Sequence, residues 1–391
     1  MKVRPTSRRH VKARVPNSNG HADRRRRLTR VGAATCAFIV VLLVCASFIT
    51  VPYEAITPGS TFDVSHLITL PSGIRHADSG SVSLVDVDLV PLRAIDYLFF
   101  RFNPDNQIVP TGEILGANTQ STVDEQGLLD MVSAQQAATY VAFQQLGYSI
   151  RAQQERVVVY DLLPRSPAAL GSSRVSLRVG DIICKFDGDV ITSVASLRRS
   201  IIHHRVGDRV TIEVERYGQS RMHSVQLRLG ALSSKRSGVE VCSVSSASMA
   251  QAFRRDAPCL GVVLMPIYHL GNMPFVVKLS AGGIIGPSAG LAFTLGIIRD
   301  LDRLSLTNGL SVAATGTIAM DGSIGDVGGV AQKTIEVRNS KASVFFVPTS
   351  EFQVAKSRAG PHLRVFPVTS ISQVLRDLHT LGGQILRRVP R

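Results

Sequence analysis

Two side chains in this sequence have the chemistry of an acyl transfer: the hydroxyl of Ser288 and the amine of Lys333, which stand 45 residues apart. Ser288 follows the glycine-rich turn 281–287 and opens an apolar pattern at helical spacing, which predicts a helix beginning at or near it. Free N–H groups and the helix dipole favour negative charge there, which suits an oxyanion. Gly286 and Gly290 let a polypeptide backbone approach closely. Serine is also a common N-cap residue, so the turn by itself does not establish catalysis.

Lys333 is the base that such a serine needs, provided that its amine is neutral. The ordinary pKa of lysine is about 10.4, and a base that works near neutral pH needs a pKa of roughly 7 to 8. Burial away from acids lowers the pKa of an amine. Residues 327–332 carry no charge, and the same predicted helix offers Ile335 and Val337. The sequence is therefore compatible with a buried lysine, although most helical lysines are solvated.

Three motifs follow one another in this region: GPSAG at 286–290, Thr315-Gly316, and GGVAQK at 328–333. The segment from about 261 to 348 resembles the proteolytic domain of the Lon protease family, which uses a Ser/Lys dyad. The resemblance implies that Ser288 is the nucleophile, that Lys333 is the general base and that Thr315 orients the lysine. It gives a supporting role to the turn residues Gly286, Pro287, Ala289 and Gly290. The chain departs from the family at Thr317, where an acidic or charged residue is usual.

Other hydrolases and an ATP-driven machine fit the sequence less well. GPSAG also satisfies the G-x-S-x-G motif of α/β-hydrolases, with Asp321 or Asp326 and His362 as the remaining triad. No α/β-hydrolase alternation precedes Ser288, and only 103 residues follow it. The chain has no GNSGG motif of trypsin-like proteases. It also has no Walker A motif, because the nearest approach at 327–334 lacks both glycines. We expect no ATP, metal or other cofactor.

A second pattern precedes the serine, in short strands separated by Gly/Asp turns. Ser166-Pro167-Ala168, the GDII segment at 180–183 and Asp187-Gly188 follow at spacings that resemble a PDZ domain in its permuted bacterial form. Such a domain adds an extended peptide to a sheet edge and holds its terminal carboxylate with backbone N–H groups. The carboxylate-binding loop of that family corresponds to Leu146, Gly147, Tyr148, Ser149 and Ile150. A hydrophobic strand start explains these five residues about as well.

The amino-terminal charge distribution predicts a membrane anchor. Residues 1–30 contain eleven Lys or Arg and one acid, which supplies +10 of the net charge of +15. The next 23 residues, 31–53, carry no charge, and about 20 apolar residues suffice for a transmembrane helix. A cleaved signal peptide has a shorter apolar region. Because basic flanks stay in the cytoplasm, we expect an extracytoplasmic catalytic domain, with membrane lipid and not nucleic acid as a partner.

The sequence thus predicts an α+β protein of five parts. These are a basic cytoplasmic arm (1–30), a transmembrane helix (31–53), a β-rich region ending in a helix at 128–146 (54–146), a PDZ domain (147–230) and a Lon-like proteolytic domain (231–391). The sequence does not decide whether 54–146 belongs to the protease fold, with the PDZ domain inserted. The expected activity is that of an ATP-independent serine endopeptidase acting on unfolded or extended polypeptides.

Several features stay open at this stage. The alternative function is a membrane-anchored PDZ adaptor with an inactive Lon-like domain. Lon-type domains assemble in rings, so the resemblance also implies a homo-oligomer. The five cysteines follow no metal-ligand spacing, and a bridge between Cys242 and Cys259 is open.

Overall fold

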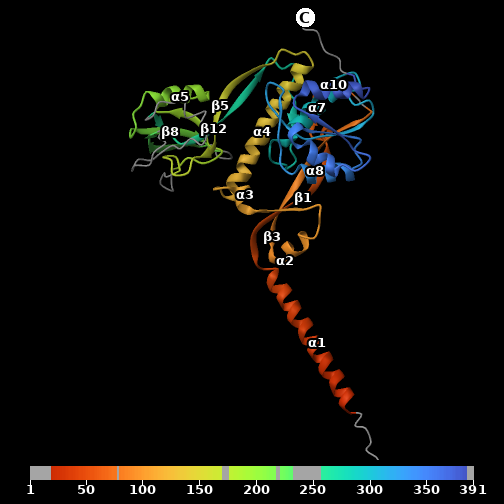
Figure 1. The fold of residues 1–391 in the computed structure, drawn as a ribbon. Helices are drawn as coiled ribbons and strands as arrows, with labels where there is room; N and C mark the ends of the chain where they lie inside the picture. Colours follow the sequence, from red (N-terminus) through yellow and green to blue (C-terminus); the bar gives the residue numbers. More distant parts are fainter. Residues whose placement is uncertain (1–18, 77–78, 170–175, 217–220, 232–256, 385–391) are drawn as a thin grey trace, which may run out of the picture.

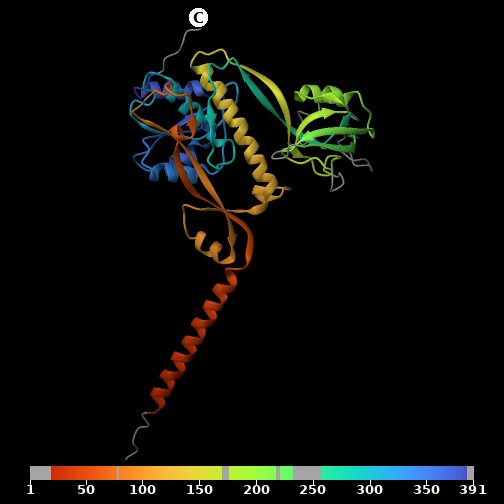
Figure 2. The same ribbon diagram turned by 180° about the vertical axis from the view of Figure 1, so that it is seen from behind.

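The computed structural model describes residues 19–76, 79–169, 176–216, 221–231 and 257–384. A long helix, α1 (Asn19–Ala46), leads into a main body, from which a second sheet domain projects to one side (Figures 1 and 2). The fold is mixed α/β. The main body carries the predicted Ser/Lys chemistry, and the projecting domain is the segment that resembles a PDZ domain.

The main body is built on a sheet of six strands. Their order across the sheet is β18-β17-β14-β3-β1-β4. β14, β17 and β18 run parallel, β3 joins β14 in parallel, and β1 is antiparallel to both β3 and β4. The strands are β1 (Thr50–Asp63), β3 (Ser81–Arg93), β4 (Gln107–Pro110), β14 (Ser311–Ala314), β17 (Val344–Pro348) and β18 (Arg364–Val368).

Helices cover both faces of this sheet, because its central strands are apolar on both sides. Phe346 points into the core shared with α4 (Gln120–Gln145), α7 (Gly290–Leu301) and α10 (Ile371–Thr380). The preceding residue, Phe345, points into the opposite core with α8 (Val330–Asn339) and α9 (Phe352–Arg358). Successive side chains of a strand point to opposite faces, which places the serine helix α7 and the lysine helix α8 on opposite sides of the sheet.

Residues before and after the projecting domain share the same sheet and the same core. β3 pairs with β14, and Ser81 Oγ donates to Ser311 Oγ at 3.3 Å across 230 residues of sequence. Val82 and Leu291 lie in one buried cluster. The region 54–146, left open by the sequence, therefore forms part of the main body, and the projecting domain is inserted into it.

The inserted domain has its own sheet in the order β12-β5-β6-β8-β9, with β7 paired to β6. Its elements are β5 (Arg151–Leu162), β6 (Ile182–Phe186), β7 (Asp189–Val190), α5 (Val194–Ile202), β8 (Arg209–Glu215), β9 (Met222–Arg228) and β12 (Val262–Gly271). The domain boundary predicted at residue 231 placed β12 in the carboxyl-terminal domain, whereas the structure pairs it with β5 along its whole length. These two strands form the ribbon that joins the inserted domain to the main body (Figure 1).

Short elements complete the fold. Three antiparallel pairs are β2 (Ile68–Thr69) with β13 (Lys278–Leu279), β10 (Gly230–Ala231) with β11 (Pro258–Cys259), and β15 (Thr317–Ile318) with β16 (Ile324–Gly325). The short helices are η1 (Val64–His66), α2 (Ala94–Phe100), α3 (Thr111–Leu115), η2 (Pro287–Ala289) and η3 (Thr349–Glu351). Cys259 is disulfide-bonded, and Cys242 lies outside the described residues.

The amino-terminal helix is shorter at its carboxyl end than the predicted span 31–53. α1 ends at Ala46, and Thr50–Tyr53 already belong to β1. The β-branched run Ile49-Thr50-Val51 favours a strand, and Pro52 has no N–H to continue a helix. Within the described ranges, no helix combines the length and the apolar character needed to cross a bilayer. The transmembrane helix stays a prediction from the sequence.

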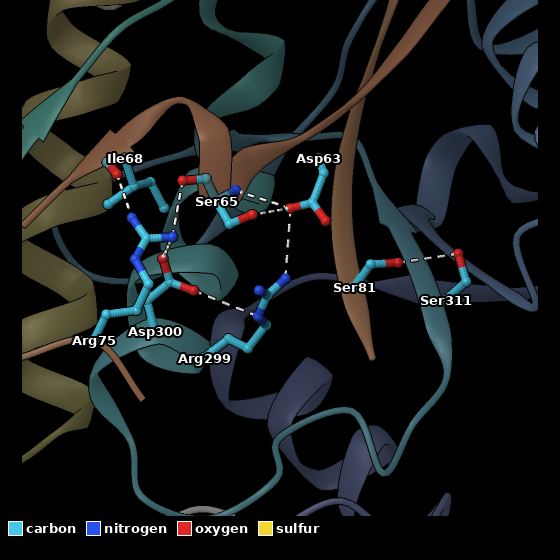
Figure 3. Close-up of polar contacts among 8 residues, drawn as sticks. All are labelled: Asp63, Ser65, Ile68, Arg75, Ser81, Arg299, Asp300 and Ser311. Carbon is cyan, nitrogen blue, oxygen red and sulfur yellow. Dashed lines mark hydrogen bonds and ion pairs between the residues drawn. The ribbon is translucent and has the colours of Figure 1, made fainter. Parts of the chain in front are cut away.

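A polar cluster around the buried Asp300 links the far end of α7 to the end of β1 (Figure 3). Asp300 pairs with Arg75 through Nη1 at 2.8 Å and with Arg299 through Nε at 3.4 Å. Arg299 also reaches Asp63 at the end of β1, at 3.5 Å. Asp300 is fully buried, and a buried carboxylate requires such partners. The cluster therefore holds the helix that follows Ser288 in a fixed place.

Candidate active site

Ser288 lies in η2, the single turn that opens α7. Gly286 precedes it with φ of 92°, a left-handed conformation that favours glycine, and its N–H donates to the carbonyl of Gly127 on α4 at 2.8 Å. A Cβ atom at Gly290 would lie 2.8 Å from Cγ2 of Ile318 and 3.1 Å from its nitrogen. Glycine at 290 thus lets the serine turn pack directly against β15. Ser288 itself is partly exposed.

The backbone of Ser288 is hydrogen-bonded to the end of β14. The carbonyl oxygen of Ser288 accepts from the N–H of Gly316 at 3.0 Å, and the carbonyl of Gly316 accepts from the N–H of Leu291 at 3.1 Å. The N–H of Thr315 donates to Phe346 of β17 at 3.1 Å. The predicted Thr-Gly motif therefore lies against the predicted serine turn.

Lys333 is the fourth residue of α8, and its side chain is 3% exposed. The helix starts after Gly329, whose φ is 67° and where a Cβ atom would come within 2.9 Å of Val87 on β3. The close packing against β3 places the lysine in the interior. Its Nζ donates to Oγ1 of Thr315 at 3.5 Å, and Thr315 Oγ1 donates to the Ser288 carbonyl at 3.4 Å. Thr315 thus touches both predicted catalytic residues.

The surroundings of Lys333 lower the pKa of its amine to about 8. Burial is the main cause, because it disfavours the charged ammonium. The negative charges of Glu351 and Asp86 act in the opposite direction and limit the decrease. A lysine with this pKa is neutral in a substantial fraction of molecules at mildly alkaline pH, as a general base requires.

Glu351, which the sequence analysis did not single out, joins the lysine helix to β17. Its Oε1 accepts from the N–H of Val327 at 3.2 Å, in the loop that leads into α8, and burial raises the pKa of its carboxyl. The neighbouring Ser350 hydroxyl donates to Asp326 of the same loop. No sequence motif marks Glu351, since its contacts depend on the packing of η3 against a loop more than twenty residues away.

The residues of the rival hydrolase triad are not assembled. Asp321 accepts from the backbone and hydroxyl of Ser323 within its own turn, and Asp326 binds Ser350. His362 is exposed, and among the described residues no hydrogen bond or ion pair joins it to either aspartate. Within the described part of the chain, no cluster of His, Cys, Asp and Glu could hold a metal ion.

The predicted carboxylate-binding loop lies at the junction of the two sheet domains. Leu146 follows the last residue of α4 and is buried in the core of the main body, and Tyr148 meets Phe143 edge-on at 5.4 Å between ring centroids. Ile150 is buried, whereas Gly147 and Ser149 are at least partly exposed. Leu146 thus packs in the core of the main body. A peptide-binding role for 146–150 stays a prediction.

A different segment of the inserted domain has the geometry for strand addition. β12 is the outer strand of its sheet, and α5 lies beside β11 and β12. The turn Leu260-Gly261 before β12 is fixed from the other side, because Ala168 N–H donates to Leu260 at 3.1 Å and Ser166 Oγ donates to Gly261 at 3.0 Å. Sequence reasoning missed this edge because β12 comes after the motifs of the domain that it completes.

Two protein families match this chain in the segments that the motifs indicate. Residues 144–227 match the family model of the PDZ domain, and residues 274–380 match that of the Lon protease (S16) C-terminal proteolytic domain. Both resemblances seen in the sequence are confirmed. The chain therefore combines a PDZ domain with a Lon-type proteolytic domain, and the latter supports a serine peptidase.

Individual proteins are similar to parts of this chain. Over 83 residues the chain is 35% identical to the Lon protease of Malacoplasma penetrans (strain HF-2), a stretch that is 21% of this chain and 10% of that protein. The chain thus spans about a tenth of the length of this curated relative. Crystal structures of PDZ domains from SdrC-like proteins of Listeria monocytogenes and Listeria innocua are 20% and 22% identical, and both alignments have a TM-score of 0.20. They cover 29% of this chain and 93% and 97% of those domains.

Proposed function

We propose that this protein is a serine endopeptidase in which Ser288 is the nucleophile and Lys333 is the general base. The observation that carries the proposal is the buried amine of Lys333, with a pKa of about 8, joined through Thr315 to the backbone of Ser288. Burial of a charged amine destabilises the folded protein, so it offers no advantage to a lysine with a purely structural role. For a general base it lowers the pKa into the range in which the neutral amine can accept a proton.

The reaction is an acyl transfer in two halves. The Ser288 oxygen attacks the scissile carbonyl carbon while its proton passes to neutral Lys333, and backbone N–H groups of the η2 turn stabilise the oxyanion. The intermediate then expels the amine of the leaving peptide, which receives the proton from the lysine. In the second half, Lys333 takes a proton from water, whose oxygen attacks the acyl carbon. Breakage of the ester returns the proton to Ser288.

Substrate choice belongs to the PDZ domain in this proposal. Its support is the position of β12 beside α5 as the outer strand of the described PDZ sheet, where an extended polypeptide would add as a further strand. Unfolded segments and exposed chain ends meet this requirement, which fits a peptidase whose sequence has no nucleotide-binding loop for a motor. Assembly into a ring stays a prediction.

The proposal also places the catalytic domain outside the cytoplasm, anchored through α1. Its support is the uncharged stretch 31–53 after a basic arm, and the exposure of seven consecutive apolar side chains at 38–44, which cover nearly two helical turns. Apolar residues on all sides of a helix are typical of a helix surrounded by lipid or protein. Resistance of the full chain to alkaline extraction from membranes tests the anchor.

Peptide release from an unfolded protein, measured by mass spectrometry without ATP, tests the peptidase. The full chain in detergent is compared with Ser288→Ala, Lys333→Ala and the control His362→Ala. We expect loss of cleavage in the first two variants and full activity in the control. Activity that survives Lys333→Ala but not His362→Ala would favour the hydrolase triad, and an inactive unmodified chain would favour the adaptor.

A further inference from the structure

Five large apolar side chains are exposed where α1 meets the main body. Phe48 and Ile49 follow the end of α1, and Leu98, Phe99 and Phe102 lie on or just after α2. Their exposed fractions range from 52% to 82%, so three phenyl rings and two aliphatic side chains are exposed at this junction. We name these five residues the base patch. Exposed apolar clusters of this kind mark interaction surfaces.

The base patch is held in one geometry by contacts between its two halves. The N–H of Ala94, the first residue of α2, donates to the carbonyl of Ile49 at 2.8 Å. Arg93 Nη1 donates to the carbonyl of Ser47 at 3.2 Å, and the rings of Tyr53 and Tyr97 pack at 5.1 Å between centroids. α2 is therefore fixed to the residues that follow α1, and in both views α2 lies beside the junction of α1 and β1 (Figures 1 and 2).

The surroundings of the base patch identify its partner. Arg93 and Arg101 flank α2 and are exposed, while Asp96, the acid on α2, accepts from the N–H of Arg93 at 3.1 Å. Tyrosines, phenylalanines and arginines around an apolar surface are typical of the membrane interface, where rings lie at headgroup level and cations meet anionic lipid. The patch also continues the exposed apolar surface of α1 at Val44.

We propose that the base patch lies in the headgroup region of a lipid bilayer and seats the main body on the membrane surface. The proposal rests on the anchor through α1, because Phe48 comes two residues after the last residue of that helix. If α1 enters the bilayer, the hydrogen bonds from Ala94 and Arg93 bring α2 to the same surface. The catalytic domain then stands at a fixed height and does not swing freely on its anchor.

The sequence contains no tryptophan, which allows a direct test by fluorescence. The full chain carrying Phe99→Trp or Phe102→Trp is reconstituted in vesicles of phosphatidylglycerol and phosphatidylcholine, with bromine placed either near the headgroups or deep in the acyl chains. Phe38→Trp reports on α1, and Val190→Trp, exposed on β7 of the PDZ domain, is the matched control.

We expect Phe99→Trp and Phe102→Trp to show blue-shifted emission that shallow bromine quenches more strongly than deep bromine, with Val190→Trp unaffected. Quenching at Phe38→Trp without quenching at either patch position would overturn the base-patch proposal and leave the anchor intact. Quenching at the patch positions without quenching at Phe38→Trp would support the patch and contradict the transmembrane anchor. Absence of quenching at all positions would contradict both.

Discussion

The amine of Lys333 donates to the hydroxyl of Thr315 at 3.5 Å, and both side chains are buried. The same hydroxyl lies 3.4 Å from the carbonyl of Ser288. The lysine comes from α8 on one face of the sheet, and the serine turn leads into α7 on the other face. Thr315, at the end of β14 between them, is therefore the residue that relates the two.

Replacing Thr315 with valine keeps the shape of the side chain and removes the hydroxyl. We expect kcat to fall about fivefold with little change in KM, because the lysine loses a hydrogen bond of roughly 1 kcal/mol that orients it. Thr294→Val is the matched control, since Thr294 is also buried and its hydroxyl only bonds its own helix at Gly290. Equal loss in the two variants would indicate a packing effect and contradict an orienting role.

The pKa of about 8 for Lys333 predicts the pH dependence of cleavage. The neutral amine is the active form, so kcat/KM rises with pH, about tenfold per unit below the pKa, and levels off above it. A pH-rate profile with a chromogenic or fluorogenic peptide measures this midpoint. A profile that levels off near pH 6 to 7, as for a histidine base, would contradict the assignment.

Glu351 influences the midpoint of the pH-rate profile, because its negative charge raises the pKa of Lys333. Glu351→Gln removes the charge and keeps an oxygen to accept from Val327 N–H, so the midpoint of the pH-rate profile shifts to lower pH. Glu351→Ala also removes the contact with the loop before α8, and we expect a lower kcat. Glu336→Gln on α8 is the control, and its profile stays at the original midpoint. An unmoved midpoint in Glu351→Gln would contradict this role.

Burial of Lys333 also predicts a gain in stability when the amine is removed. Below a pH of about 8 the lysine is protonated in both the folded and unfolded chain, and the burial penalty is fully present. Lys333→Met removes a penalty of at most about 3 kcal/mol at neutral pH. Between pH of about 8 and 10.5, the unfolded chain binds more protons at Lys333 than the folded chain, so the unmodified protein gains stability as the pH rises. The difference in unfolding free energy between Lys333→Met and the unmodified protein therefore shrinks. Denaturant titrations at pH 7 and pH 10 measure it.

The outer position of β12 in the described PDZ sheet predicts where polypeptides bind. Val263 is 39% exposed on β12, and we expect Val263→Asp to weaken binding of peptides with a free terminal carboxylate by about tenfold, through charge repulsion and a less apolar edge. Val190→Asp, at an exposed position of β7, leaves binding unchanged. Fluorescence anisotropy of a labelled peptide provides the measurement, and an effect at Val190 alone would place the site elsewhere.

The site was predictable from the sequence where its geometry is local. Gly286 and Gly290 mark the serine turn because the positive φ at 286 favours glycine and a Cβ atom at 290 would crowd Ile318, and the glycine pair before α8 marks the start of the lysine helix. Glu351 was not predictable, because its contact with Val327 depends on how η3 packs on a distant loop. No spacing rule encodes that packing.

The fold was predictable within each segment and less so between segments. The sequence indicated a β-rich region at 54–146, but not that β3 of this region joins the main sheet or that β12 belongs to the PDZ sheet. Such pairings depend on partners far along the chain, as with Arg299 and Asp63, which are 236 residues apart. Pro52 was a local signal that the helix ends early, because proline has no N–H to continue it. The predicted span 31–53 followed the uncharged stretch instead, and α1 ends at Ala46.

The pairing of β3 with β14 across 230 residues has a consequence for how the chain folds during synthesis. The main sheet is incomplete until β14, β17 and β18 have left the ribosome, whereas the PDZ sheet, closed by β5 and β12, is finished earlier. Its completion brings Arg151 next to Gly271 and removes the intervening residues from the loop that must still close. This roughly halves the loop and lowers its closure cost by about 0.6 kcal/mol. The PDZ domain is thus expected to fold first and to hasten maturation of the peptidase domain that surrounds it.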